Sequence, residues 1–221
     1  GLSLVLPQSS TTYFWITADL SISAGIGRTI SVKEWTTGNY TVSSGIKSGS
    51  AAAGGSQTFV AFASLASDYF RSNATGNWAT AATWQSSHDN VNWGTATLSP
   101  NSSAKTITVS AFTKVTVASN VTVDEVTVNG TLAINGSVTL TVADNLGTDL
   151  LINNTLEKTG TGQVSYNPGA TASFASGSYY VHQNTTDNGS IPVASWHANS
   201  YCVISGYTTN TTAPTGLGQN F

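Results

Sequence analysis

The chain has 221 residues, a net charge of −3 and only 8% charged residues, while Ser and Thr fill 64 positions. Seven basic residues are too few to follow a phosphate backbone, which excludes a nucleic-acid surface. No apolar run approaches the roughly 20 residues that span a bilayer as a helix. A single cysteine, Cys202, excludes an internal disulfide and a cysteine-rich metal site.

Helix signals are nearly absent, and strands separated by Gly, Asn, Ser and Asp dominate the chain. Residues 1–66 are predicted to form a few strands of a β-sandwich, because aromatic and β-branched residues alternate there. The clearest segments are 13–17, 29–32 and 40–42. We expect this part to be the end of an immunoglobulin-like (Ig-like) domain whose earlier strands precede Gly1.

Residues 67–101 form a tryptophan-rich junction, with Trp78, Trp84 and Trp93 inside 16 residues. Two interpretations are open. A repetitive β-stack exposes an apolar end, which bulky aromatic side chains can cover as a cap. The same indoles could instead form a platform on which sugar rings stack. We favour the cap and keep sugar binding as the alternative.

From residue 102 onward, short strands follow one another, most of them after connections of two to five residues. They place an aliphatic residue on one face and Thr on the other, as in 107–109 and 126–128. The pairs Asn129-Gly130 and Asn135-Gly136 would also suit a meander of hairpins. The short strands and the lack of alternating charge favour a parallel, right-handed β-helix over 102–221 that continues beyond the last residue.

The residues give no good sign of catalysis. No two of the three histidines have the spacing of metal ligands. Asp124 and Glu125 are adjacent, and on a strand their side chains would point to opposite faces, so a glycosidase pair is not expected. Asp144 and Asp149 flank a turn without a calcium-repeat pattern. We therefore predict a protein that is not an enzyme and that carries no metal or cofactor.

Several stretches resemble large proteins that Bacteroidetes-type bacteria export by the type IX secretion route. Residues 70–93, from Phe70-Arg71-Ser72 to Trp93, are similar to the start of the β-helical region in those proteins. Residues 190–206 resemble a later portion of the same region, and residues 213–221 resemble a segment that is followed by further sequence. The segment at 13–17 is similar to the Ig-like segments that precede such β-helices.

The resemblance implies an adhesin-like protein, secreted to the bacterial cell surface, without an assigned activity. Such proteins carry a C-terminal sorting domain that is not found in these residues, so we expect the chain to be part of a longer polypeptide. A second cysteine tends to follow in similar proteins, which would pair Cys202 with a residue outside this chain. A buried free thiol on a strand is the alternative.

The leading hypothesis is a non-catalytic structural or adhesive segment of a large secreted surface protein. Its partners would be the rest of the parent polypeptide, the type IX secretion machinery, surface glycans and further copies of itself. A carbohydrate-binding module is the alternative, with sugar rings stacked on Trp78, Trp84, Trp93 and Tyr179. Part of a glycan-degrading β-helix enzyme and an ice-binding threonine ladder are the remaining hypotheses.

Overall fold

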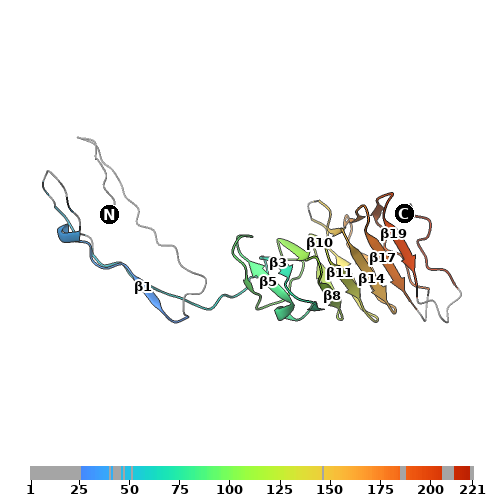
Figure 1. Cartoon of the computed structure of the whole chain (residues 1–221), viewed down its shortest axis with the longest axis horizontal. Coiled ribbons are helices and arrows are strands. Elements are labelled where there is room, and N and C mark those ends of the chain that lie inside the picture. Colours follow the sequence, from blue (N-terminus) through green and yellow to red (C-terminus); the bar gives the residue numbers. More distant parts are fainter. Residues whose placement is uncertain are drawn as a thin grey trace. The chain divides into compact units, whose positions relative to one another are not determined.

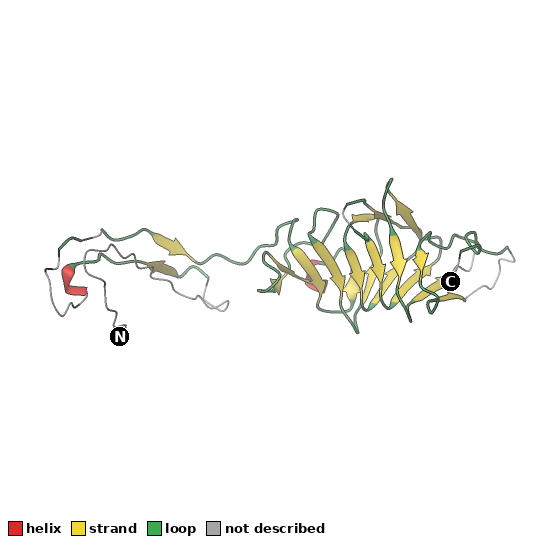
Figure 2. Cartoon of the chain, turned by 90° about the horizontal axis from the view of Figure 1, so that it is seen from above, coloured by secondary structure: helices red, strands yellow, loops and turns green. Residues whose placement is uncertain are grey.

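The computed structural model describes residues 26–39, 41, 46, 48–50, 52–145, 147–184, 188–205 and 212–219. These residues contain 19 strands and two 3-10 turns of three residues each, which confirms the all-β prediction (Figure 1; Figure 2). The chain divides into two compact units, Gly1–Ala61 and Phe62–Phe221. The predicted strand at 13–17 and most of the one at 40–42 lie outside the described residues.

The first unit contains one antiparallel pair of short strands. Strand β1 (Thr29–Ser31) pairs with β2 (Ser56–Thr58), so that Thr29 lies opposite Thr58. The 3-10 turn η1 (Thr37–Asn39) lies between them in sequence. None of the side chains described in this unit is buried. The described part is therefore a two-stranded ribbon without the buried interior that a β-sandwich requires.

In the second unit, from β7 onward, strands that follow one another in sequence belong to different sheets. From β7 onward every pairing between strands is parallel. The largest sheet has the order β18 (Ser195–Trp196), β16 (Ala172–Phe174), β13 (Leu150–Ile152), β10 (Val126–Val128), β7 (Thr106–Val109), β3 (Tyr69–Ser72), β5 (Trp84–Ser87) and β6 (Gly94–Thr95). The second contains β19 (Tyr201–Ile204), β17 (Tyr179–Gln183), β14 (Thr155–Thr159), β11 (Thr131–Ile134), β8 (Lys114–Val117) and β4 (Gly76–Asn77). The third contains β15 (Gln163–Tyr166), β12 (Thr139–Val142) and β9 (Val121–Val123).

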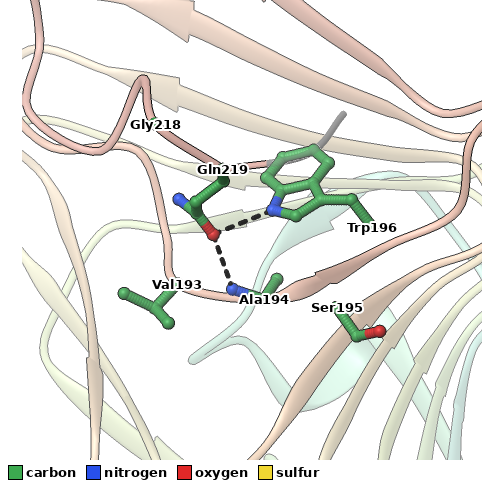
Figure 3. A pocket seen from close by; sticks show the side chains of 6 residues that line it. All are labelled: Val193, Ala194, Ser195, Trp196, Gly218 and Gln219. Atoms are coloured by element: carbon green, nitrogen blue, oxygen red, sulfur yellow. Dashed lines mark hydrogen bonds between the residues drawn. The ribbon is translucent and has the colours of Figure 1, made fainter.

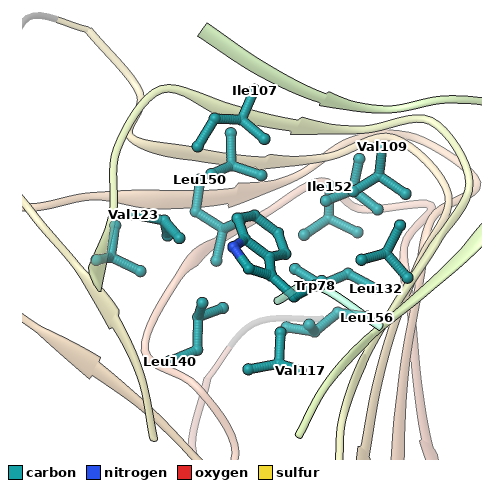
Figure 4. Packing of buried hydrophobic residues seen from close by; sticks show 14 of the residues in the cluster. Trp78, Ile107, Val109, Val117, Val123, Leu132, Leu140, Leu150, Ile152 and Leu156 are labelled. Atoms are coloured by element: carbon teal, nitrogen blue, oxygen red, sulfur yellow. The ribbon is translucent and has the colours of Figure 1, made fainter. Parts of the chain in front are cut away.

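Inward side chains at equivalent positions of neighbouring strands form continuous buried columns. In the second sheet, Val115 pairs with Leu132 and Leu132 pairs with Leu156, and all three are fully buried. In β8 and β12 an outward Thr separates the two buried positions, as the period of two in a β-strand requires. The columns of the three sheets meet in one hydrophobic cluster, which Figure 4 shows around the indole of Trp78.

The Asn-Gly connections do not form hairpins. Asn129-Gly130 leads from β10 in one sheet to β11 in another, and neither strand pairs with the other. The meander alternative is therefore wrong for this part of the chain. A Cβ atom at Gly130 would overlap the backbone oxygens of Ser110 and Thr113, so the corner admits only glycine without rearrangement. At this corner Gly130 allows two backbone segments to approach closely, and it is not part of a tight hairpin turn.

The tryptophan-rich region contains the antiparallel strands of the second unit. Strand β5 pairs antiparallel with β3 and with β6, and the 3-10 turn η2 (Ala81–Thr83) precedes β5. Phe70 of β3 and Trp84 of β5 are fully buried and belong to the same cluster as the aliphatic columns. Aromatic side chains of this region are thus packed against the aliphatic columns, and their role as a cap stays a prediction.

The buried column predicts that a substitution at an inward position lowers the free energy of unfolding much more than a substitution at an outward position. Leu156→Ala leaves a cavity between Leu132 and Tyr180, so we expect the free energy of unfolding to fall by about 2–5 kcal/mol. Thr127→Ala, on the outward face of β10, should change it by about 0.5 kcal/mol or less. Urea denaturation of both variants measures the difference. Equal losses would contradict the assignment of Leu156 to the stacked interior.

Candidate functional site

The structure separates the predicted tryptophans into two groups. Trp78 and Trp84 are only 2% and 0% exposed, and their rings meet edge to face with centroids 4.8 Å apart. Trp78 Nε1 donates to the Pro100 carbonyl at 2.9 Å, and Trp84 Nε1 donates to the Trp78 carbonyl at 2.8 Å. Neither ring has a face open to a sugar, so the prediction of glycan stacking is corrected at these two positions.

Trp93 lies differently, because a cation covers its ring. The half-buried indole has the guanidinium carbon of Arg71 4.2 Å from its ring centroid. Arg71 Nε also donates to Gln85 Oε1 at 2.9 Å, across the β3–β5 pair. On the same strand as Arg71, Tyr69 has Lys105 Nζ 5.0 Å from its ring centroid. Sugar stacking on Trp93 was the alternative to the cap, and neither interpretation predicted the contacts of Arg71 and Lys105 with aromatic rings.

Tyr179 is exposed and belongs to a short aromatic ladder. Its register partner is Tyr201, and the two rings stack with centroids 4.7 Å apart and planes 14° apart. Tyr179 is 40% exposed and Tyr201 is 50% exposed. Each ring covers one face of the other, so only the outer faces and the edges of the pair can contact a ligand.

Cys202 lies on an inward position of β19, next to Tyr180 of β17 in the strand register. It is half-buried and forms no disulfide within the described residues. Burial raises the pKa of its thiol, which favours the neutral form over the reactive thiolate. The prediction that it pairs with a cysteine outside the chain stays a prediction.

An open hollow of about 410 Å³ lies beside β18, where Gln219 fastens the segment 212–219 (Figure 3). The Gln219 side-chain oxygen accepts hydrogen bonds from the Ala194 backbone NH at 3.0 Å and from Trp196 Nε1 at 2.9 Å. Its side-chain nitrogen donates to the Pro192 carbonyl at 3.0 Å. The Trp196 ring in turn stacks on Phe174, with centroids 3.9 Å apart. The Gln219 amide thus already occupies the Ala194 NH and the Trp196 indole NH, two of the hydrogen-bond donors that line this hollow.

Three carboxylates gather at the corners that precede β10 and β13. Asp124, Glu125 and Asp149 each bring one oxygen atom within 4.8 Å of the others. Glu125 has a φ of 50°, so the chain turns there instead of continuing as a strand. The expectation that Asp124 and Glu125 point to opposite faces is therefore wrong. Oxygen ligands of this kind could hold a hard cation such as Ca²⁺.

The environments of these carboxylates shift their pKa values in different directions. Burial raises the pKa of Asp124 and of Glu125, and the neighbouring carboxylates raise them further. Burial would also raise the pKa of Asp149, but hydrogen bonds from Thr171 and Asn145 outweigh it and lower the value. Asp124 and Asp149 are buried, so a large substrate has no access to either side chain.

A buried polar network lies between the later strands and the segment 188–190. Lys158, on an inward position of β14, donates to the Ser190 carbonyl at 3.0 Å. The Tyr180 hydroxyl and His182 Nδ1 are 2.8 Å apart, and His182 Nε2 lies 2.9 Å from the Asn188 carbonyl. These contacts fix the loop against the sheets. The inward position of Lys158 was not predicted, because lysine is rarely buried.

Comparison with known proteins adds no relative: no family model, curated protein or solved structure matches this all-β chain. Among the described residues, no helix is long and apolar enough to cross a membrane.

The Gln219 contacts predict a local role for this side chain. Gln219→Ala removes the acceptor shared by Ala194 and Trp196, so we expect faster hydrogen exchange at the Ala194 amide and a red-shifted tryptophan emission. The global melting temperature should change by no more than about 2–4 °C, the shift that 1 kcal/mol produces in a chain of this size. Unchanged exchange at Ala194 would contradict this role.

The carboxylate cluster predicts an unusual pH dependence of stability. Because the pKa of Asp124 is raised on folding, its ionisation destabilises the fold as the pH rises above about 4. In buffer with a chelator, Asp124→Asn should therefore melt higher than the wild type at pH 7, and the gap should close toward pH 4.

Asp149→Asn is the matched control, because the pKa of Asp149 is lowered on folding. Its ionised form stabilises the fold above the unfolded pKa, so this variant should melt below the wild type at pH 7 and approach it in acid. Melting curves between about pH 2 and pH 8 test both variants, because the stabilisation by Asp149 is lost only below its unfolded pKa of about 4. The same direction of change in both would contradict the assignment of opposite shifts.

Proposed function

We propose that the chain is a non-catalytic structural and adhesive segment of a secreted bacterial surface protein, with residues 102–221 forming a right-handed parallel β-helix. The observation that carries the proposal is the unbroken inward column on parallel strands, from Val115 through Leu132 to Leu156. In such a stack each repeat contacts only its neighbours, so length grows by addition of repeats and the interior stays dry. A rod of this kind suits the display of binding surfaces away from a cell.

The surface chemistry also favours a structural role. The outward positions carry mainly Thr and Ser, and the chain has only 8% charged residues. Lys114 and Glu157 form one ion pair on the second sheet, at 2.6 Å. A surface of hydroxyl groups limits nonspecific ionic contacts, which is useful for a segment that spaces other domains.

The type IX adhesin-like assignment rests on the sequence resemblance. Under this proposal the ribbon of β1 and β2 is part of an Ig-like sandwich, and the parent polypeptide and the secretion machinery are the partners. The half-buried Cys202 on β19 would then bond to a cysteine elsewhere in the parent protein. The proposed location is the bacterial cell surface.

Carbohydrate binding is the second candidate function. It is favoured by the exposed stack of Tyr179 and Tyr201 and by the Arg71–Trp93 pair, since aromatic and guanidinium groups contact sugars well. A glycan-degrading role has less support. The closest group of acids, Asp124, Glu125 and Asp149, has two buried members, and a polymer needs an accessible pair.

Duplication of one repeat tests the structural proposal. Thr131 and Thr155 occupy equivalent positions in the register, so a second copy of residues 131–154 inserted after Asn154 should extend the stack by one repeat. We expect a folded protein with a melting temperature at or above that of the wild type and a larger β-signal in circular dichroism.

The control is an insertion that breaks the register. A second copy of residues 131–142 alone adds strands without completing a repeat, so it should unfold or aggregate. If the full-repeat insertion fails to fold as well, the sheets do not form an extensible stack and the rod proposal is wrong.

A further inference from the structure

Two cations lie on one outward sheet face and have aromatic partners in place of acidic ones. Arg71 covers the Trp93 ring, and Lys105 lies over the Tyr69 ring. Neither forms an ion pair with any carboxylate in the part of the chain that the structure describes. They differ in this from Lys114, whose ammonium group is neutralised by Glu157. An uncompensated pair of cations is notable in a protein with a net charge of −3.

The guanidinium of Arg71 is held in one orientation. The Trp93 ring below it and the hydrogen bond from Nε to Gln85 Oε1 restrain two directions of movement. Its two terminal nitrogens form no hydrogen bond to any of the described residues. They present a planar pair of donors, which matches the two oxygens of a carboxylate. Because the protein already orients this guanidinium, less side-chain conformational entropy is lost when a ligand binds.

The second cation lies near enough to act on the same polymer. Tyr69 and Arg71 are two residues apart on β3, which is about 7 Å along a strand, and both side chains face outward. Lys105 is exposed above Tyr69. A chain with a carboxylate on each of its sugar units can therefore meet both cations at once, with its rings against the aromatic edges.

We propose that the outward face of β3, β5 and β6, with Arg71, Lys105, Trp93, Gln85 and Tyr69, binds acidic glycans of the polyuronate type. Arg71 binds a carboxylate through its terminal nitrogens, and Lys105 neutralises a second one. The carboxylates Asp124, Glu125 and Asp149 lie at the corners before β10 and β13, whereas the proposed path leads from Lys105, directly before β7, over β3 toward β5 and β6. The site goes beyond the structural role proposed above and does not depend on it.

Titration of the full 221-residue chain with polygalacturonate tests the site, with fully methyl-esterified polygalacturonate as the uncharged control. We expect binding of the acid form, weakening with salt, and at least about tenfold weaker binding of the ester. Arg71→Gln should weaken binding of the acid form at least about tenfold, and Lys105→Gln somewhat less. Arg71→Lys keeps the charge but loses the planar donors, so its affinity should fall between those of the wild type and Arg71→Gln.

Lys114→Gln is the matched control, because it changes the net charge by the same amount at a cation that already has an acidic partner. It should bind polygalacturonate as the wild type does. Circular dichroism and melting curves establish that each variant is folded. No binding by the wild type, equal binding of acid and ester, or an equal loss in Lys114→Gln and Arg71→Gln would each overturn the proposal. The rod proposal is tested by stability alone, so the two can fail separately.

Discussion

In-register pairing of parallel strands is the constraint on which the rest of this structure depends. Because side chains alternate along a strand, a slip of one residue would turn every Val and Leu outward and every Thr inward. The register places Val126 beside Leu150 and Ile107, and Leu140 beside Val121 and Val164. The buried columns of the three sheets then meet in one hydrophobic core. The register constrains the strands and leaves the conformation of the corners between them free to vary. Side chains at the corners align as well, since Asn153 donates to Asn129 one repeat earlier at 2.8 Å.

The same constraint explains why the buried interior changes from aliphatic to polar and aromatic side chains along the chain. Equivalent positions must be occupied in every repeat, and in one column Ile134 is followed by Lys158 and then by His182. An ammonium group in that position has to find acceptors inside, and the Ser190 carbonyl supplies one. The loop around Ser190 is therefore held by the interior of the stack. Aromatic stacking takes over in the neighbouring column, where Phe174 and Trp196 lie face to face.

Much of the fold could be predicted from the sequence, and most of the site could not. The tripeptides at 107–109 and 126–128 predict strands with one buried face because their period is local, and the structure has β7 and β10 there. The partners of a side chain are set by register and by corners, which sequence spacing does not reveal. Asp149 joins Asp124 through the stacking of two corners, and the positive φ of Glu125 breaks the alternation on which its predicted direction relied.

The tryptophans show the same limit of prediction from the sequence. Their density predicts an aromatic cluster, but only the pairing of β3 with β5 decides that Phe70 and Trp84 face the core while Arg71 and Gln85 face outward. An exposed cation–π contact contributes only about 0.5–1 kcal/mol, so the Arg71–Trp93 pair adds little to stability. Its larger effect is on geometry, because a guanidinium that is fixed and unneutralised meets an anion without first losing its own freedom. Most outward positions carry hydroxyl groups, so such a cation is one of the few groups on this surface that can discriminate between ligands by charge.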